Sequence, residues 1–295
     1  MALTSPTAPQ RLKALLPDAV AQPLAVYARR SALVHRLRVR SQAKRCDVFL
    51  VSFPKVGRTW LRVLIGRSFQ QHYDLPKKAI LRVTAARVPT PGMPRILATH
   101  DDATQDKPYA YVIGDKSAYR AHRVLFMVRD PRDVLISYYF QRTRRNQNLY
   151  KGSIGDFISE PNGGLETIIS FYNAWAAQRD VPAAFHLVRY EDLRADTTTS
   201  LREALSFVGS GDIPDETLAE AIEHASFERV QQRERTGAAK QKALRAWNPN
   251  DPESFKARRG KIGGYVDYLT EEQIAEVERR LQRLDPLYGY HKRAT

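Results

Sequence analysis

Lys55 and Arg58 lie in a short loop whose surroundings suit the binding of a phosphate. The loop follows Val48–Phe53, an apolar run rich in β-branched and aromatic residues that is typical of a buried strand. After Gly57 the apolar spacing becomes that of a helix. In such a turn the loop amides and the positive end of the helix dipole converge on one anion, and the two cationic side chains add full charges. An ordinary strand-to-helix connection with a solvated lysine explains this segment alone equally well.

A histidine ends a second apolar run, which starts at Arg95 and continues through Ala98 and Thr99 to His100. In open α/β sheets, the residues just past the carboxyl ends of strands face the ligand crevice. His100 is therefore placed for proton transfer, a role that suits imidazole near neutral pH. The chain has seven histidines, and a structural role remains the more common one for any of them.

Arg129 and Ser137 form a third candidate group. Arg129 ends the apolar run Arg123–Val128, and the following Asp-Pro pair supplies an N-cap and a first-turn proline for a helix. Ser137 lies two turns into that helix, so both side chains could reach one phosphate. Alternatively, Arg129 simply pairs with Asp130 or Asp133.

The elements that position these residues alternate between strand and helix patterns along the chain. This alternation predicts an α/β fold, P-loop-like and doubly wound, with a mainly parallel sheet flanked by helices. A fourth strand is expected at Ala184–Arg189, followed by the turn Tyr190–Leu193. The last helix is expected at 270–284, opened by a capping box that starts at Thr270. The charged, poorly patterned stretch Gln231–Pro252 is expected to form a mobile flap. Further helices are expected at 60–69, 134–140, 165–178, 201–208 and 218–222.

Composition limits the possible functions. The chain has 295 residues, of which 43% are hydrophobic, enough for a proper core. Its formal net charge of +15 favours anionic partners. The single cysteine, Cys46, excludes an internal disulfide and a cysteine metal cluster, as expected for a reducing cytosol. The sequence shows neither a membrane-spanning run nor a secretory signal.

The first 46 residues form a basic arm, and residues 47–295 are expected to form the main domain. A basic amphipathic helix is predicted over Leu24–Arg45, with Leu33, Val34 and Leu37 roughly on one side. Such a helix either lies on an anionic membrane surface or packs on the domain with its charges in water. The second arrangement is the more common.

Several segments together resemble motifs of the cytosolic-type sulfotransferases, which use 3′-phosphoadenosine 5′-phosphosulfate (PAPS). The resemblance runs from about Val48 to Thr270. The family motifs are YPKSGTTW, TH, RNPKDVxVSYY, YEDL, SF and RKGxxG, in that order. The matching segments are Phe53–Trp60, Thr99–His100, Arg129–Tyr139, Tyr190–Leu193, Ser226–Phe227 and Arg258–Gly263. One such match is weak evidence, but the ordered set is strong.

The resemblance implies a PAPS site that holds two separated phosphates, with adenosine 3′,5′-bisphosphate (PAP) as the product and no metal. It implies that Lys55 stabilises the departing bridging oxygen, that His100 removes the acceptor proton, and that Ser137 restrains the lysine until acceptor binds. Arginine suits the 3′-phosphate because its planar fork binds phosphate bidentately. The residues implied to bind the nucleotide are Lys55, Val56, Gly57, Arg58, Thr59, Trp60, Arg129, Ser137, Tyr190, Ser226, Phe227, Arg258, Arg259 and Gly260.

The sequence departs from the family pattern at several positions. Val56 and Arg58 replace a serine and a threonine of the phosphosulfate loop, while the backbone donors remain. Ala98 stands where many members have a lysine. Of the family's dimer motif only Thr270 remains, so the sequence leaves the oligomeric state open.

Two other functions were weighed. A P-loop kinase or nucleotidase is disfavoured because the loop lacks GxxxxGK[ST]. A nucleic-acid-binding protein suits the charge, but no known nucleic-acid module is recognisable and the basic residues are spread along the chain. The expected partner is a small-molecule, lipid or saccharide acceptor rather than nucleic acid. The expected location is the cytoplasm, with peripheral membrane contact through the arm left open.

Overall fold

A computed structural model of the chain describes residues 33–76, 79–88, 90–101, 112, 114–145, 149–236, 248, 251–255 and 260–291. The predicted nucleotide-binding residues Arg258 and Arg259 lie outside these ranges, as do residues 1–32 of the basic arm. Residues 237–247 of the predicted flap also lie outside them.

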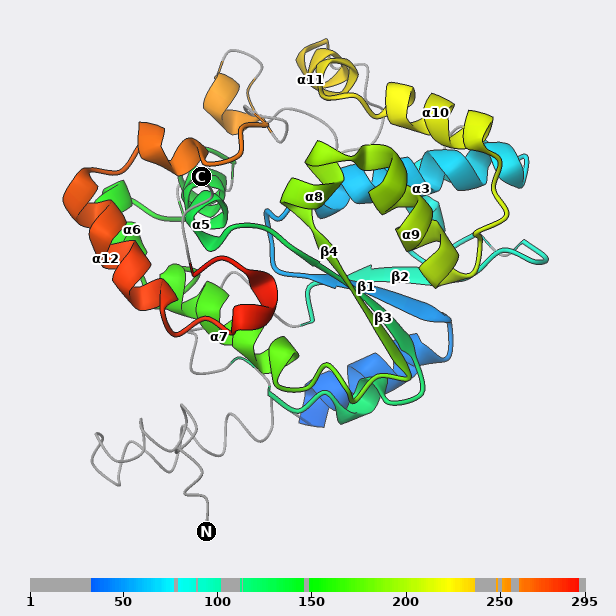
Figure 1. Cartoon of the computed structure of the whole chain (residues 1–295), viewed down its shortest axis with the longest axis horizontal. Coiled ribbons are helices and arrows are strands. Elements are labelled where there is room, and N and C mark those ends of the chain that lie inside the picture. The colour runs from blue at the N-terminus through cyan, green and yellow to red at the C-terminus, as the bar shows by residue number, and fades with distance from the viewer. Residues whose placement is uncertain are drawn as a thin grey trace.

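A parallel four-stranded sheet forms the centre of the molecule (Figure 1). The strands lie in the order β2-β1-β3-β4, and every neighbouring pair is parallel. The predicted α/β fold class is therefore confirmed. The strands are β1 (Val48–Ser52), β2 (Ile96–Thr99), β3 (Arg123–Val128) and β4 (Ala184–Arg189).

The winding of the chain reverses at β1, because β2 lies on one side of it and β3 on the other. Such a switch point opens a crevice at the carboxyl edge of the sheet, where ligands bind in open α/β folds. The register aligns the strand ends at this edge, since Val51 pairs with Thr99 and Val128 pairs with Arg189. The segments that follow the four strands therefore begin side by side.

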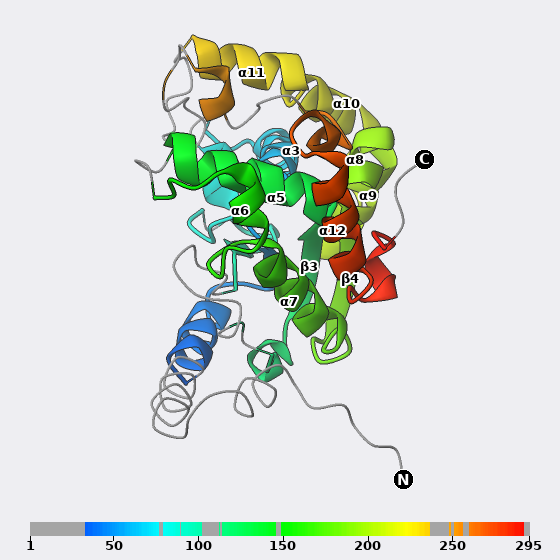
Figure 2. The same ribbon diagram turned by 90° about the vertical axis from the view of Figure 1, so that its left-hand side faces the viewer.

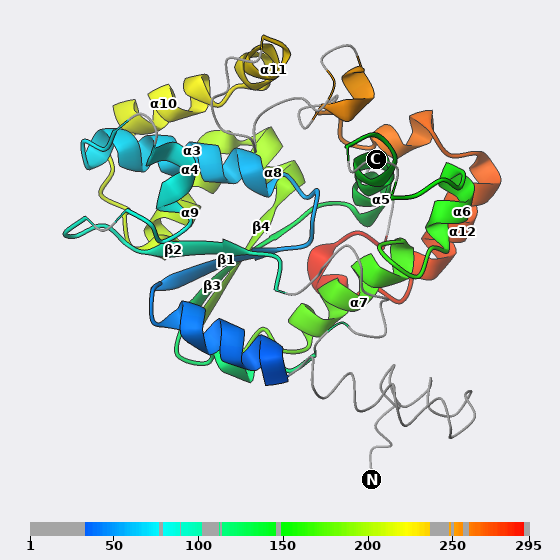
Figure 3. The ribbon, with the colours of Figure 1, turned by 180° about the vertical axis from the view of Figure 1, so that it is seen from behind.

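Helices cover both faces of the sheet. Figures 1 and 3 show α3, α9 and α10 on one face, and α7 with the helical residues 33–43 on the other. Figure 2 shows α5 and α7 next to α12. Helix α6 also contacts α12, because a Cβ at Gly155 would meet the Gln273 side chain at 2.5 Å. The longer helices are α3 (Arg58–His72), α5 (Pro131–Phe140), α7 (Leu165–Ala176), α9 (Thr197–Val208), α10 (Asp215–His224), α11 (Phe227–Arg235) and α12 (Glu271–Leu281). The shorter ones are α4 (Ile80–Val83), α6 (Ile154–Ile158) and α8 (Tyr190–Ala195), and a π-helical turn, Gln141–Arg145, directly follows α5.

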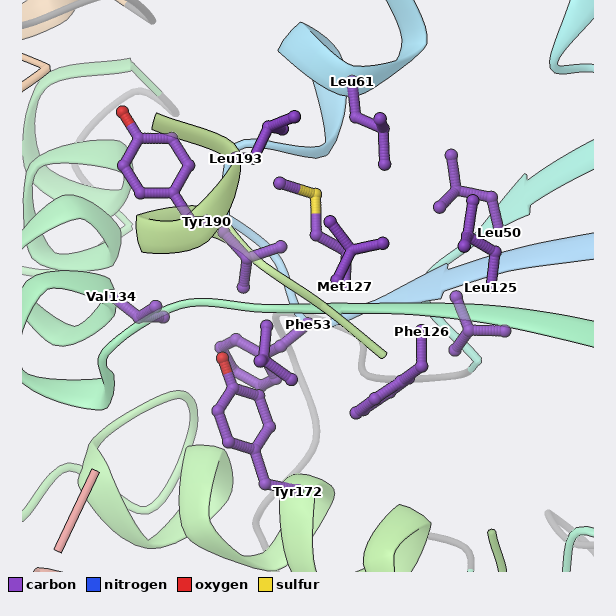
Figure 4. Close-up of a cluster of buried hydrophobic side chains, with 14 of the residues drawn as sticks. Leu50, Phe53, Leu61, Leu125, Phe126, Met127, Val134, Tyr172, Tyr190 and Leu193 are labelled. Carbon is purple, nitrogen blue, oxygen red and sulfur yellow. The ribbon is translucent and has the colours of Figure 1, made fainter. Parts of the chain in front are cut away.

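The two central strands are buried on both faces, as their continuous apolar runs predict. Figure 4 shows Met127 and Leu61 on one side of β3, and Phe126 and Tyr172 on the other. The Phe126 ring lies 5.3 Å, centroid to centroid, from that of Trp175 on α7. Strand β2 differs from the predicted buried run, because only its first residue is buried. It is an edge strand with a single neighbouring strand.

Helix caps follow the sequence signals. Asp130 accepts a hydrogen bond from the Arg132 amide at the start of α5, and a proline occupies the first turn. Thr270 and Gln273 form the predicted capping box of α12. The predicted flap is partly wrong, because its first residues, Gln231 to Arg235, belong to helix α11.

Residues 33–43 are helical, within the range predicted for the amphipathic helix. The predicted apolar side is exposed: Leu33, Val34 and Leu37 are more than half exposed. The helix buries His35 and Val39 instead. This buried side combines apolar and polar contacts, because Val39 joins the hydrophobic core and His35 Nε2 comes to 2.8 Å from the carboxylate of the buried residue Asp101.

Asp101 is the centre of a buried polar cluster directly after His100. Lys116 Nζ lies 2.6 Å from one carboxylate oxygen, and the Tyr119 hydroxyl donates to the other at 2.5 Å. Burial alone would raise the pKa of the Asp101 carboxyl, but the Lys116 ammonium and His35 outweigh it and hold the pKa below its ordinary value. The stabilisation from this depressed pKa is present above the unfolded pKa and is lost as the pH falls. The cluster fixes the chain that carries His100.

Replacing Lys116 by methionine should destabilise the protein by about 3 kcal/mol at pH 7, because it leaves the Asp101 charge buried without its main partner. Methionine has an unbranched side chain like that of lysine, and at this site it would lie beside the Trp175 ring, whose centroid is 4.8 Å from Lys116 Nζ. The measurement is urea unfolding. The control is Arg95→Met, which breaks an exposed ion pair with Asp47 and should cost less than about 1 kcal/mol. Equal losses from both variants would contradict the assigned role of the cluster.

Candidate active site

The loop between β1 and α3 has an unusual backbone. Lys55 has a φ of 71° and Gly57 a φ of 91°, both in the left-handed region. A Cβ at Gly57 would meet the Tyr190 ring at 2.6 Å, so only glycine lets the loop approach that ring. No side chain caps the start of α3, and its first turn has no acidic residue. The backbone amides of this loop and the dipole of α3 are therefore arranged as they are in anion-binding sites at helix N-termini.

Aromatic and cationic side chains gather beside this loop. The Trp60 ring, from α3, lies 5.9 Å from that of Tyr190, the first residue of α8. The Arg129 guanidinium carbon lies 4.5 Å from the Tyr190 ring centroid. Trp60 Nε1 also donates to the Ala225 carbonyl at 2.9 Å, which ties α3 to the segment that opens α11. The structure thus brings together residues that are far apart in the sequence and that were predicted to bind the same nucleotide.

Arg129 lies at the end of β3 and makes two hydrogen bonds through Nη2. One goes to Asp133 at 3.1 Å, as one of the two sequence interpretations expected, and the other goes to the Lys261 carbonyl at 3.0 Å. Burial opposes the charge, but Asp133, Tyr190 and Glu191 outweigh it and raise the pKa of Arg129. Its Nε is buried without a hydrogen-bond partner among the described residues. Arg129 is therefore a permanent cation with a donor still to be satisfied.

The segment 260–265 lies against the same region. A Cβ at Gly260 would meet the Phe227 ring at 2.7 Å, so these two predicted site residues are in close contact. Asp133 accepts hydrogen bonds from the amides of Gly263 and Tyr265, at 3.0 and 3.1 Å. Asp133 therefore holds both the glycine loop and Arg129, a role that the sequence interpretation gave only as a simple pairing.

Lys55 is half-buried and reaches the element after β3. Its Nζ lies 3.3 Å from Gln141 Oε1, in the π-helical turn that follows α5. Gln141 is four residues after Ser137, so both belong to the same side of this helical segment. Ser137 itself is half-buried. Gln141 is not among the residues predicted from the sequence, although its spacing of four from Ser137 is a signal that could have found it.

His100 follows β2 and contacts the neighbouring strand end. Its Nδ1 lies 2.9 Å from the Ser52 carbonyl oxygen, and its Nε2 lies 2.7 Å from Nη2 of Arg58. Nη1 of Arg58 donates to the Thr99 carbonyl. The predicted base and the predicted phosphate loop are thus in direct contact.

The remaining predicted residues fall into two groups. Val56 is fully buried, so only its backbone can face a ligand, whereas Thr59 at the start of α3 is partly exposed. Ser226 caps α11 by accepting a hydrogen bond from the Arg229 amide, and Phe227 follows it.

Among the described residues, no group of three acidic, histidine or cysteine side chains is arranged to hold a metal ion.

Comparisons with known proteins identify the family of the chain. The sulfotransferase domain family matches residues 45–287, most of the chain. The chain belongs to the sulfotransferase family. Two relatives are flavonol 3-sulfotransferase of Flaveria bidentis, 24% identical over 79% of this chain and 80% of the relative, and cytosolic sulfotransferase 17 of Arabidopsis thaliana, 23% identical over 80% and 73%.

A solved structure supports the fold. The mouse sulfotransferase SULT7A1, complexed with PAP, superposes with a TM-score of 0.58 at 20% identity, over 83% of this sulfotransferase and 86% of the mouse chain. At this identity the likeness shows the fold alone.

The family match counts against the kinase and nucleic-acid-binding alternatives. Among the residues that the structure describes, no helix is both long enough and apolar enough to cross a membrane.

Replacing Gly57 by alanine should destabilise the sulfotransferase by about 2 kcal/mol more than replacing Gly92 by alanine. Both glycines have positive φ, at 91° and 75°, so the backbone strain is matched. Only at Gly57 does the added Cβ meet Tyr190, whereas nothing lies within 4 Å at Gly92. Thermal unfolding of the two variants measures the difference. Equal stabilities would show that the loop does not need its close approach to Tyr190.

Proposed function

We propose that this sulfotransferase moves a sulfuryl group from PAPS to a hydroxyl or amine of an acceptor. The observation that carries the proposal is the meeting of three strand ends at one edge of the sheet. The Lys55 loop, His100 and Arg129 follow the adjacent strands β1, β2 and β3. The PAP bound to the mouse sulfotransferase supports the choice of nucleotide.

The residues present fit such a nucleotide. An uncapped helix start at α3 suits the 5′ end, held by the loop amides and Thr59. The unsatisfied Nε of Arg129 suits the 3′-phosphate, with Ser137 and the backbone near Gly260 beside it. Arg258 and Arg259 are proposed for the same phosphate from the sequence alone. Trp60, Tyr190 and the Ser226–Phe227 segment are proposed to hold the adenine.

PAPS supplies an activated sulfuryl group, whose transfer resembles phosphoryl transfer with charge developing on the departing oxygen. We assign Lys55 to stabilise that oxygen, because its ammonium belongs to the loop proposed to bind the 5′ end. We assign Gln141, whose Oε1 lies 3.3 Å from Lys55 Nζ, and Ser137, one turn earlier on α5, to orient the lysine. His100 removes the acceptor proton, and its Nδ1 contact with the Ser52 carbonyl holds the ring in place.

The acceptor is proposed to be a small molecule, with a lipid or a saccharide as further candidates. The flavonol in the name of the Flaveria relative supports the small-molecule class. We place the protein in the cytoplasm, as the name of the Arabidopsis relative indicates for that protein. In this proposal residues 47–295 form the transferase domain and residues 1–46 a basic arm able to contact an anionic membrane surface.

Replacing Lys55 or His100 by alanine should lower kcat for sulfuryl transfer from PAPS by about 100-fold or more, because each removes a group that acts on a reacting atom. The assay follows labelled sulfate transferred to acceptors in a metabolite extract. Matched controls are Lys44→Ala, an exposed residue directly after the helical residues 33–43, and His122→Ala, directly before the amino end of β3. Retention of most of the rate in either site variant would remove that residue from the mechanism.

Replacing Arg129 by methionine should weaken PAP binding by about 30-fold, equivalent to about 2 kcal/mol, since a charge-assisted phosphate contact is lost. Isothermal titration with PAP measures the change, and ATP serves as the competing nucleotide. The control is Arg123→Met at the opposite end of β3, where the guanidinium packs over Phe207. Unchanged PAP affinity in the Arg129 variant would refute the 3′-phosphate assignment.

A further inference from the structure

Arg58 contacts the histidine that the proposed function assigns as the base. The guanidinium belongs to the first residue of α3, yet it reaches the end of β2 and binds two groups there. Nη1 donates to the Thr99 carbonyl, and Nη2 lies 2.7 Å from His100 Nε2. This contact links the phosphate-binding loop directly to the atom that would receive the acceptor's proton.

The contacts of His100 define its protonation. The Ser52 carbonyl can only accept a hydrogen bond, so Nδ1 carries the hydrogen of that 2.9 Å contact. A guanidinium can only donate, so Nε2 must be the acceptor. His100 is therefore neutral in this arrangement, and its basic nitrogen is already occupied by Arg58.

The charge of Arg58 lacks a matching anion in the described part of the chain. Its two hydrogen-bond partners, a carbonyl and a neutral imidazole, are both uncharged. Burial, with a smaller contribution from Arg62, lowers the pKa of Arg58 to about 9, so the group remains protonated at neutral pH. A buried cation of this kind is stabilised when an anion arrives beside it.

Three charged residues in the described part of the chain, close to His100 or Arg58, have partners of their own. The Asp101 carboxylate, next in sequence, binds Lys116 and Tyr119 and lies beside His35. Arg62, one turn along α3, donates to Thr84 and to the Leu81 carbonyl. The Lys55 ammonium contacts Gln141.

We propose that Arg58 is a catalytic switch: it occupies Nε2 of His100 in the resting enzyme and moves to the sulfuryl group when the acceptor hydroxyl takes that place. This inference rests on the proposed sulfuryl transfer. It gives the Arg58 side chain a role distinct from the backbone anion binding of the loop. Arg58 stands where the family motif has a threonine, so the motif itself does not include this switch.

The bonds that change require this exchange. The acceptor O–H bond breaks and its proton goes to His100 Nε2, while the acceptor oxygen forms a bond to sulfur. The sulfur–bridging oxygen bond breaks, and its electron pair leaves with the 5′-phosphate. Arg58 leaves Nε2 when the acceptor hydroxyl binds there, before the proton is transferred. The displaced Arg58 can then donate two hydrogen bonds to sulfuryl oxygens as charge spreads over them. Once protonated, Nε2 is a donor on a cationic ring, which repels the guanidinium and prevents its return during the transfer.

Nitrogen NMR of the ligand-free protein tests the resting contact without any turnover. With labelled histidine and arginine, we expect a coupling across the hydrogen bond between Arg58 Nη2 and His100 Nε2, and a hydrogen on Nδ1. Arg58→Met should abolish the coupling and shift the Nε2 resonance, while Arg62→Met should leave both unchanged. An Nε2 resonance that is the same in Arg58→Met and wild type would overturn the proposal.

Steady-state kinetics test whether the Arg58 guanidinium acts on the sulfuryl group during the reaction. Arg58→Met should lower kcat about 100-fold with PAP affinity changed less than about threefold, whereas replacing Arg62, a partly buried arginine on the same helix, by methionine should keep kcat within about threefold. Ethylguanidinium added to Arg58→Ala should restore kcat at least tenfold. A wild-type kcat in Arg58→Met, or absence of rescue, would refute the switch. Failure of the proposed function would look different, since the wild type would then transfer no sulfate while its Arg58–His100 coupling remained.

Discussion

The position of β1 between β2 and β3 is the constraint on which the rest of the site depends. It puts the loop after β1 between two other strand ends, one followed by His100 and the other by Arg129. The Ser52 carbonyl at the end of β1 then lies 2.9 Å from the imidazole of the next strand. Because the strands are parallel and the register aligns their ends, the residues that we propose to be reactive all follow one edge of the sheet.

The charges at this edge are divided between two kinds of environment. Arg129 is paired with Asp133, which raises its pKa and also holds the amides of the glycine loop, so this cation is fixed in place. Arg58 contacts only uncharged groups in the described part of the chain, and burial lowers its pKa. The first environment suits a phosphate that stays bound throughout the reaction. The second suits a group whose charge changes as the reaction proceeds.

The four strands and the positions of most longer helices could be predicted from the sequence, because strand ends, caps and loop motifs are local signals. The motifs also predicted residues that the structure places at the carboxyl edge of the sheet, and their roles stay predictions. The strand at β4, the Asp-Pro start of α5 and the capping box of α12 were all predicted from neighbouring residues. Contacts between distant segments were not predictable in this way. Arg58 and His100 are 42 residues apart, and Lys55 and Gln141 are 86 apart. Likewise, the buried side of residues 33–43 includes His35, whose partner Asp101 is far along the chain, and this contact could not be read from the apolar pattern of the helix itself.

A crystal structure with PAP bound tests the central claim most directly. The account predicts the 5′-phosphate on the amides of residues 55–59, with Lys55 Nζ and His100 Nε2 facing the space beyond it from the loop and the neighbouring strand end. It also predicts the 3′-phosphate on Arg129. A nucleotide bound away from the carboxyl edge of β1 and β3, or Lys55 and His100 turned to opposite sides of the sheet, would contradict the account.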